Sequence, residues 1–304
     1  MTMKLEQFWS LQGPFIDKNG DGVIDGVSLF IHFPGNKMPS GMLDFCARLG
    51  LETTALSFDW FEWSGQKTTM EFIESAGSTY AEFEGDRLRC FYENEAALSE
   101  LLSELAQMGR SHYAPPAESP TRHIRSLAEL WSFSGFGAMD EATPHHALSL
   151  NIDMDEAVAS PDLFRELCFF AARCGLYSTA LDLPLTGNPN ARIALAVVSG
   201  DASRLRLPAD NRLELSGSPQ GTARALQGLN RSHHWSSGGE FGYWEEETQL
   251  ADKEEAEGWF ETEWHGRSER KRMHDILEGL SLTGGDRLEI FLSEPLSIRR
   301  KLEP

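Results

Sequence analysis

The amino-acid sequence predicts an α/β (α+β) protein made of two tandem, duplicated β-α-β-β-β-α units. The run Ala47–Leu56 returns 125 residues later as Ala172–Leu181. The same offset produces two further matches, Asp86-Arg87-Leu88 with Asn211-Arg212-Leu213 and Leu101 with Leu226. A self-match at a fixed period is typical of a repeated structural unit. Between the matches, apolar residues follow strand and helix periodicities in the same order in both halves.

The first unit is assigned to residues 27–110. Val27–Phe33 is rich in strand-forming residues, and apolar residues then recur at helical spacing from Met42 to Leu49. Three strands and a closing helix are predicted next, at Thr53–Trp60, Thr69–Ser75, Arg87–Tyr92 and Leu98–Met108.

The second unit, residues 147–235, repeats this order of elements. Its first helix has Ser160 as a cap and Pro161 at its first position. The predicted elements are Leu148–Met154, Leu163–Cys174, Ser178–Leu183, Ile193–Val198, Arg212–Leu215 and Ala223–Leu229.

The connections predict the topology of each unit. A strand, a crossover helix and a strand favour parallel pairing, and later strands add as antiparallel hairpins. We therefore expect mixed sheets with helices on one face. Gly50 and Gly175 are predicted to end the first helices in left-handed positions. The matched Arg48 and Arg173 are expected to complement a helix dipole, with a binding role as the alternative.

Three segments lie outside the units: an N-terminal segment (1–26), a linker (111–146) and residues 236–304. The last begins as an acidic excursion and continues with a helix and a strand. Ser293-Glu294-Pro295 then resembles a helix start, which predicts the beginning of a third α/β unit. The acidic stretch also holds Trp244 and Trp259. It is either a solvated excursion or a recognition loop that binds a cationic group through cation–π contacts.

Amino-acid composition limits the classes of binding partner that we expect. The net charge of −20, with scattered basic residues, excludes nucleic acid and anionic membranes as expected partners and favours a cationic ligand or a protein partner. No apolar run approaches the ~20 residues of a membrane span. The N-terminus lacks a signal-peptide pattern, so a cytoplasmic protein is expected. The four cysteines form no Cys-x-x-Cys pair and are predicted to be reduced and buried: Cys46, Cys90, Cys168 and Cys174.

An Asp-rich loop before the first unit is a candidate Ca²⁺ site. The candidate ligands are the side chains of Asp17, Asn19, Asp21 and Asp25 and the carbonyl of Val23. The spacing resembles the calcium loops of EF-hands and dockerins. It departs from them at Ser28, where an EF-hand has a bidentate Glu. We predict one structural Ca²⁺ completed by another oxygen; the alternative is an Asx- and Gly-rich turn.

The chain contains no strong catalytic motif. A His-Glu-x-x-His zinc motif, a Gly-x-Ser-x-Gly elbow and a P-loop are all absent from the sequence. The preferred hypothesis is therefore a non-catalytic, duplicated module that binds a ligand or partner. The alternative is a hydrolase with a His/carboxylate site in the cleft between the units. The candidate histidines for that site are His112, His145, His233 and His265.

Three segments together resemble a known family: Phe15–Val27, Ala47–Leu56 and Phe291–Pro295 with Arg299. The pattern is similar to the non-catalytic N-terminal region of large bacterial proteins grouped with the zinc carboxypeptidases. The resemblance implies that a catalytic domain follows beyond residue 304. The family's His-x-x-Glu zinc motif is absent here, so the resemblance implies no catalytic residue in this chain.

Overall fold

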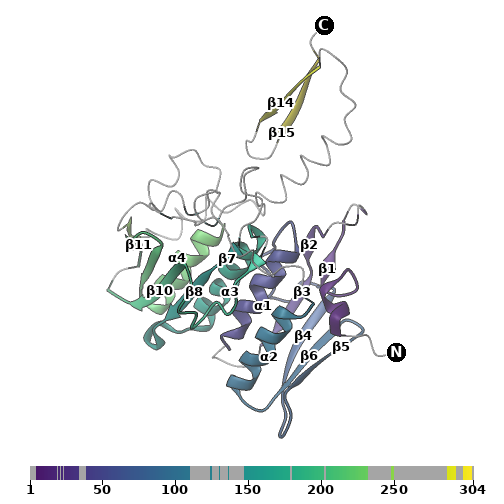
Figure 1. Ribbon diagram of the computed structural model, residues 1–304, viewed down its shortest axis with the longest axis vertical. Helices are drawn as coiled ribbons and strands as arrows, with labels where there is room; N and C mark the ends of the chain where they lie inside the picture. The colour runs from purple at the N-terminus through teal and green to yellow at the C-terminus, as the bar shows by residue number, and fades with distance from the viewer. Residues whose placement is uncertain are drawn as a thin grey trace.

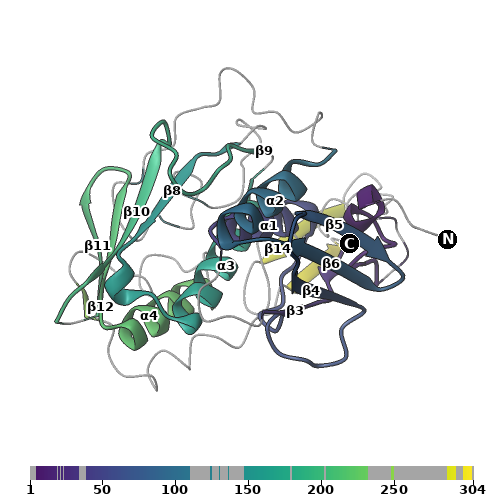
Figure 2. The same cartoon turned by 90° about the horizontal axis from the view of Figure 1, so that it is seen from below.

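The fold consists of two α/β units whose helices face each other between two sheets (Figures 1 and 2). The computed structural model describes residues 5–18, 20, 22, 24–33, 39–109, 124, 130, 136, 147–178, 180–201, 203–231, 248–249, 286–291 and 297–302. The central layer contains α1 (Gly41–Glu52), α2 (Glu95–Gln107), α3 (Pro161–Leu176) and α4 (Pro219–Arg231). None of the helices in these ranges has the length and apolar character to cross a bilayer.

The sheet of unit 1 has the strand order β3-β4-β6-β5. Its strands are β3 (Leu29–His32), β4 (Thr68–Glu74), β5 (Tyr80–Glu84) and β6 (Arg87–Tyr92). The first three strands in this spatial order are parallel, and β5 pairs antiparallel with β6 at one edge. The helix α1 lies in the crossover between β3 and β4; the parallel pairing is as expected, but the strand after the helix is β4 and not the predicted Thr53–Trp60.

The sheet of unit 2 repeats this arrangement as β8-β10-β12-β11, with β13 (Thr248–Gln249) added beside β11. Its strands are β8 (Leu150–Met154), β10 (Ile193–Ser199), β11 (Arg204–Ala209) and β12 (Arg212–Gly217). The register also agrees. Thr69 faces Arg87 in unit 1, and Ala194 faces Arg212 at the same offset in unit 2. The predicted α/β class with mixed sheets is confirmed, and descent of the two units from one duplicated segment stays a proposal.

The smaller elements lie outside these two sheets. They are η1 (Leu5–Trp9), β1 (Phe15–Ile16), β2 (Gly26–Val27), β7 (Ala147–Leu148), η4 (Glu156–Val158), β9 (Ala180–Leu181), β14 (Asp286–Phe291) and β15 (Ser297–Leu302). The predicted last strand corresponds to β14. The helix predicted to start at Ser293 is wrong, because residues 297–302 instead form β15, which pairs antiparallel with β14.

The strand predicted at Thr53–Trp60 is also wrong. The segment is irregular, and its matched partner in unit 2 contributes only the two residues of β9. Its apolar alternation serves packing instead of sheet pairing. Trp60 is fully buried and contacts Phe169 of unit 2, with ring centroids 5.6 Å apart. Backbone hydrogen bonds from Ile31 N–H to the Trp60 carbonyl (2.7 Å) and from Thr54 N–H to the Ile24 carbonyl (3.0 Å) hold the segment beside β3 and the residues that precede it.

Gly50 and Gly175 do not end their helices; both lie inside them, at the crossing of α1 and α3. A Cβ atom on Gly50 would lie 1.8 Å from the carbonyl oxygen of Ala172. A Cβ atom on Gly175 would lie 2.0 Å from the carbonyl oxygen of Ala47. Only glycine permits this approach, so the repeated Ala-Arg-x-Gly sequence forms a reciprocal joint between the units.

The closing helices follow a slightly different offset. Asn94 caps α2 through the N–H three residues further on, at 3.0 Å, and Ser218 caps α4 in the same way, at 3.1 Å. The offset between these caps is 124 residues, one fewer than in the strands and in α1 and α3. The sequence alignment of Leu101 with Leu226 is therefore wrong by one residue.

The core lies between the helices and the inner faces of the two sheets. The four cysteines belong to it: all are free and buried, as predicted. Burial raises the pKa of the Cys90 thiol to about 12, so it stays protonated at neutral pH. These thiols are structural apolar side chains, which agrees with the sequence interpretation.

Candidate functional site

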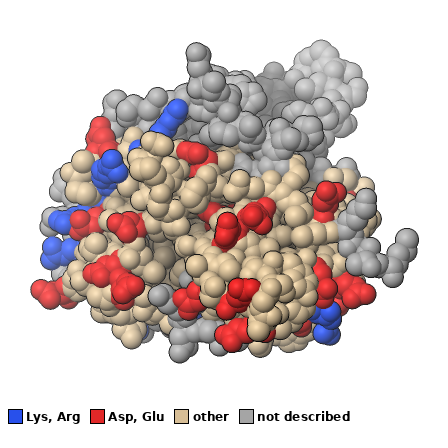
Figure 3. Space-filling view, turned by 60° about the horizontal axis from the view of Figure 1, so that its bottom comes forward, with Lys and Arg blue, Asp and Glu red and all other residues tan. Residues whose placement is uncertain are grey.

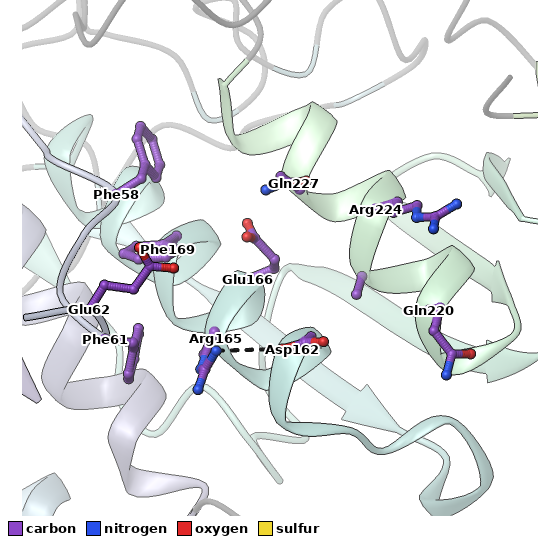
Figure 4. A pocket seen from close by; sticks show the side chains of 11 residues that line it. Phe58, Phe61, Glu62, Asp162, Arg165, Glu166, Phe169, Gln220, Arg224 and Gln227 are labelled. Atoms are coloured by element: carbon purple, nitrogen blue, oxygen red, sulfur yellow. Dashed lines mark ion pairs between the residues drawn. The ribbon is translucent and has the colours of Figure 1, made fainter. Parts of the chain in front are cut away.

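A cavity of about 350 Å³ lies between the two helices of unit 2 and the segment that follows α1 in unit 1 (Figure 4). This volume is within the ~300–1,000 Å³ typical of small-molecule sites. The segment contributes Phe58, Phe61 and Glu62 to the lining. The helices contribute Asp162, Arg165, Glu166 and Phe169 from α3, and Gln220, Ala223, Arg224 and Gln227 from α4.

Helical periodicity explains why these side chains converge. The residues of α3 follow a spacing of three and four positions, as do those of α4, so each set forms one face of its helix. The two faces form the sides of a groove, and residues 58–62 close one end of it. Both units are therefore needed to form the cavity.

Aromatic rings form the wall on the side of unit 1. Phe169 is 4 % exposed and stands between Phe58 and Phe61, with ring centroids at 5.2 and 5.5 Å in edge-to-face geometry. The buried Trp60 lies behind the same ring. This packing positions the segment after α1, although it has no regular secondary structure.

Carboxylates reach the cavity from both units. Glu166 is 8 % exposed, and the side-chain amide of Asn230 donates to its carboxylate at 2.9 Å and to its backbone carbonyl at 2.8 Å. Glu62 is exposed on the opposite side. The guanidinium of Arg165 pairs with Asp162 at 3.5 Å and lies 6.0 Å from the ring centroid of Phe61.

The equivalent place in unit 1 identifies how the cavity arises. We treat residues as equivalent when they occupy matching positions in the two units. The pairs are Gly41 with Glu166 and Asp44 with Phe169 at the 125-residue offset, and Ser99 with Ala223 and Ser103 with Gln227 at the 124-residue offset. All four partners in unit 2 line the cavity.

In unit 1 these positions are in direct contact. The N–H of Gly41 donates to the Ser99 hydroxyl at 2.8 Å, and a Cβ atom on Gly41 would lie 2.0 Å from the Ser99 carbonyl oxygen. The Ser103 hydroxyl donates to Asp44 at 2.6 Å. The other carboxylate oxygen of Asp44 accepts the N–H of Leu185, in unit 2, at 2.8 Å. Small and polar residues therefore fill in unit 1 the place that is open in unit 2.

The matched arginines stabilise helix ends and line neither described cavity. Arg48 donates to the carbonyl of Ala106 at 3.4 Å, and Arg173 donates to the carbonyls of Leu229 and Asn230 at 2.7 and 2.6 Å. Both arginines are buried. They complement the C-terminal dipoles of α2 and α4. Arg173 also lies in the last turn of its own helix, α3, as predicted, whereas Arg48 does not lie in the last turn of α1.

The Asp-rich loop is only partly described. Asp17 accepts the N–H groups of Gly20 and Gly22 at 2.7 and 2.8 Å, and Asp25 accepts the N–H of Lys18 at 2.8 Å. The other three predicted ligands, Asn19, Asp21 and Val23, lie outside the described residues. Among the residues that are described, no three His, Cys, Asp or Glu side chains form a group that could hold a metal ion. The Ca²⁺ site stays a prediction.

A second cavity of about 260 Å³ adjoins this loop. Asp25 and Lys18 line it together with Asp59, whose carboxylate accepts the Ser64 hydroxyl at 3.0 Å. The histidines proposed for a hydrolytic site lie outside the described ranges: His112, His145, His233 and His265. So does most of the acidic stretch with its tryptophans.

Searches against protein-family models, curated protein sequences and solved structures found no match to this chain. The pocket residues were also missed by the motif-based sequence interpretation. The available signal was a departure between the repeats: Gly41 is replaced by Glu166 and Asp44 by Phe169.

Proposed function

We propose that this chain is a non-catalytic ligand-binding module whose site is the pocket between residues 58–62, α3 and α4. One observation carries the proposal: the α1–α2 contact is filled by Gly41, Ser99 and Ser103, while the equivalent positions in unit 2 line a cavity of about 350 Å³. Buried apolar and polar groups that converge on a cavity are typical of ligand sites, especially where two domains meet.

The chemistry of the lining favours binding over catalysis. Among the residues that the structure describes, the lining comprises aromatic rings, carboxylates, guanidinium groups and amides, with Ala223, and no Ser, Cys, Lys or His. A nucleophile paired with a base would be expected in most covalent mechanisms. The resemblance described above agrees with such a non-catalytic role, and the proposal extends to this module being the N-terminal part of a larger hydrolase.

The second candidate function is a hydrolase that uses the same cavity. It is favoured by the two carboxylates, Glu62 and Glu166, which reach the cavity from different units. Pairs of carboxylates can act as acid and base in hydrolysis. Hydrolysis of a ligand on incubation with the wild type, lost in Glu166→Gln, would favour this candidate. Recovery of the ligand unchanged would favour the binding module.

The site is tested by filling it. Ala223→Trp places a large ring in the cavity, and Glu100→Trp places the same ring on the exposed surface of α2 as a matched control. Ligand-observed NMR with a fragment collection should give hits on the wild type and on Glu100→Trp. The same hits should weaken by at least about tenfold on Ala223→Trp. Hits that bind all three proteins equally would place the site elsewhere.

A further inference from the structure

We propose that the outer edge of β5 binds an extended segment of another protein, one that carries basic side chains at alternate positions and pairs as a fifth strand of the unit 1 sheet. This interaction surface is separate from the pocket and does not depend on its proposed function. Edge strands present unpaired N–H and C=O groups, which can pair with the backbone of an added strand.

The first argument is that this edge is open. β5 is the last strand of the unit 1 sheet, and one of its edges pairs with β6 (Figure 1). Within the part of the chain that the structure describes, no strand pairs with the other edge, and no backbone hydrogen bond joins β5 to a segment other than β6. The short helix η1 packs against β5 from the inner side, where the ring of Phe8 lies 5.5 Å from that of the buried Phe83. Tyr80 and Glu84, at the two ends of β5, are exposed.

The equivalent edge in unit 2 already pairs with an additional strand. β13 pairs antiparallel with β11, so that Arg204 faces Gln249 and Leu205 faces Thr248. β11 and β5 are equivalent, because each pairs antiparallel with the matching strand of its sheet, β12 or β6. This architecture therefore accepts a fifth strand at the place that is open in unit 1.

The second argument is a cross-strand ion pair whose charges are exchanged between the two edges. In unit 1 the edge strand carries the acid: Glu82 pairs with Arg89 of β6 at 3.1 Å. In unit 2 the edge strand carries the base: Arg206 pairs with Glu214 of β12 at 2.7 Å. Glu82 and Arg206 are equivalent, because the residues that they face match at the 125-residue offset.

The strand that pairs with the basic edge comes from an acidic part of the chain. Glu245–Glu247 directly precede β13 in the sequence, and Asp252 follows it. Opposite charges that face each other across two strands stabilise the pairing, and like charges weaken it. The edge of β5, with Glu82 and Glu84 at alternate positions, therefore favours a strand with basic side chains. A second copy of β5 is disfavoured, because it would bring these carboxylates face to face.

An exposed aromatic ring adds to this preference. Tyr80 stacks on Phe91 of β6, with ring centroids 4.6 Å apart and the ring planes at 12°. It lies on the same face of β5 as Glu82 and Glu84, because alternate residues of a strand share a face. A basic side chain of the added strand can therefore contact a ring as well as a carboxylate.

The distribution of charge over the molecule acts in the same direction. The chain carries a net charge of −20. On the face shown in Figure 3, most basic side chains lie at the left, on the side of unit 2, and acidic side chains predominate on the side of unit 1. Such a field accelerates the association of a basic partner, more so at low salt.

Isothermal titration calorimetry on the full chain tests the proposal with three matched peptides. The lysine peptide is acetyl-Thr-Lys-Val-Lys-Val-Lys-Thr-amide, and the glutamate peptide has Glu in place of each Lys. The third peptide is the lysine peptide with a methyl group on every backbone nitrogen, which keeps the charge but removes the donors that strand pairing needs. We expect the lysine peptide to bind at least about tenfold more tightly than either of the others. Hydrogen exchange measured by mass spectrometry should then show new protection at residues 80–84.

Charge-exchanged variants locate the binding at β5. Glu71→Ala is the background, because Glu71 lies 3.6 Å from Arg89 and its equivalent in unit 2 is Ala196. Adding Glu82→Arg with Arg89→Glu reproduces the charge arrangement of unit 2 and leaves the net charge of this background unchanged. The added changes should weaken binding of the lysine peptide by about tenfold relative to Glu71→Ala alone, and they should strengthen binding of the glutamate peptide.

A single variant keeps the test available if the triple variant does not fold. Glu84→Lys changes an exposed residue at the end of β5, and Glu100→Lys makes the same change in charge on the exposed surface of α2. Glu84→Lys should weaken binding of the lysine peptide by at least about threefold more than Glu100→Lys does. Thermal melting shows whether each variant is folded.

Other results would overturn the proposal. Equal binding of the lysine peptide and its methylated form, or binding insensitive to the changes at Glu82 and Glu84, would indicate attraction to the acidic surface without strand pairing. Protection of β5 that rises with protein concentration in the absence of peptide would assign the edge to a second copy. Binding that appears only in Arg299→Glu with Lys301→Glu would assign it to the basic strand β15 of the same chain. Failure of the lysine peptide to bind both the wild type and this variant would leave the acids of β5 as a protection of the edge against aggregation.

Discussion

The α1–α2 pair of unit 1 and the α3–α4 pair of unit 2 occupy the same place in their units but differ in what fills the space between the helices. In unit 1, Gly41 lies directly against Ser99. In unit 2 the equivalent residues, Glu166 and Ala223, line a cavity. In a chain built from two similar units, the departures between equivalent positions therefore locate the candidate site.

The strongest matches between the units have a different meaning. Ala47 and Gly50 of α1 meet Ala172 and Gly175 of α3, each glycine against the alanine of the other helix. This contact has approximate twofold symmetry, like an isologous interface between two subunits. The residues that are most alike in the two units thus form the contact between α1 and α3, and the equivalent positions that differ line the pocket.

The largest expected effect is at this joint. Gly50→Ala and Gly175→Ala should each lower the free energy of unfolding by more than about 3 kcal/mol, at or above the usual range for overpacking. The reason is that the new methyl group meets a backbone carbonyl at 1.8 or 2.0 Å, which no rotamer change can relieve. Chemical denaturation measures both changes.

Gly26→Ala is the matched control for the joint, because a Cβ atom there has nothing within 4 Å. It should change the free energy of unfolding by less than about 1 kcal/mol. A small effect at Gly50 with a large one at Gly175 would show that the contact is not reciprocal. Small effects at both positions would show that the two helices do not cross this closely.

The second-largest effect is expected at the Asp-rich loop, which precedes unit 1. The sequence before β8 in unit 2 has no counterpart of this loop. If the Asp-rich loop binds Ca²⁺, three carboxylates in nine residues lose their mutual repulsion. The free energy of unfolding should then rise by about 2.7 kcal/mol at a Ca²⁺ concentration a hundredfold above Kd. Calorimetric melting in Ca²⁺ and in chelator measures this increase.

Asp21→Ala should abolish most of the increase, whereas Asp86→Ala, an exposed residue in the turn before β6, should leave it intact. Identical melting curves of the wild type in Ca²⁺ and in chelator would leave the Asx- and Gly-rich turn as the explanation. The hydrogen bonds that Asp17 accepts from Gly20 and Gly22 are compatible with either state, because a carboxylate has about four lone-pair sites.

Local sequence was sufficient to predict most elements of the fold. The strand predicted at Arg87–Tyr92 has the same bounds as β6, and Ser160 caps α3 through its hydroxyl, with Pro161 as the first helical residue. Periodicity and caps are local properties, so they are visible in a short window of sequence. The crossover connection also predicted parallel pairing around α1, although the strand that pairs with β3 is β4 and not the predicted Thr53–Trp60.

What could not be predicted depends on contacts distant in sequence. Trp60 alternates with polar residues as a strand residue would, but its ring is buried against Phe169 of the other unit. In its local sequence, Gly50 resembles the glycine at the end of a helix. Its actual role is a close contact with Ala172, which is 122 residues away in the sequence and so invisible in a short window. The pocket likewise joins residues 58–62 to two later helices. A comparison of the two units could have indicated it, but only with the 124-residue offset in the last helices.

A smaller difference is expected between the two buried arginines. Arg173→Met should lower the free energy of unfolding by about 2 kcal/mol, within the ~1.5–3 kcal/mol typical of hydrogen bonds to charged groups. It removes short bonds, of 2.7 and 2.6 Å, to two carbonyls at the end of α4. Arg173→Lys should recover little, because an ammonium cannot reproduce the planar fork.

Arg48→Met tests whether the equivalent arginine in unit 1 contributes as much to the free energy of unfolding as Arg173 does. The hydrogen bond from Arg48 to the Ala106 carbonyl is longer, 3.4 Å, but Arg48 also pairs with Glu52 at 2.6 Å. Glu52→Gln removes this ion pair, so the difference in free energy of unfolding between Glu52→Gln and the double variant Glu52→Gln with Arg48→Met isolates the bond to the helix end. This difference should be smaller than the cost of Arg173→Met. A larger cost would show that unit 1 depends more on this contact than unit 2 does.

The smallest expected effect bears most directly on the comparison of the two helix pairs. Gly41→Ala should lower the free energy of unfolding by about 1–2 kcal/mol, because its methyl group would lie 2.0 Å from the Ser99 carbonyl oxygen. The cost is lower than at Gly50, because Gly41 is the first residue of α1 and a helix end can shift. Glu166→Ala, at the equivalent position, should cost under about 1 kcal/mol, because the open cavity accommodates the change and the Glu166 backbone carbonyl still accepts Asn230. Urea denaturation of both variants measures the difference directly. Equal costs would mean that the α3–α4 pair is packed as tightly as the α1–α2 pair, and that the cavity is closed in solution.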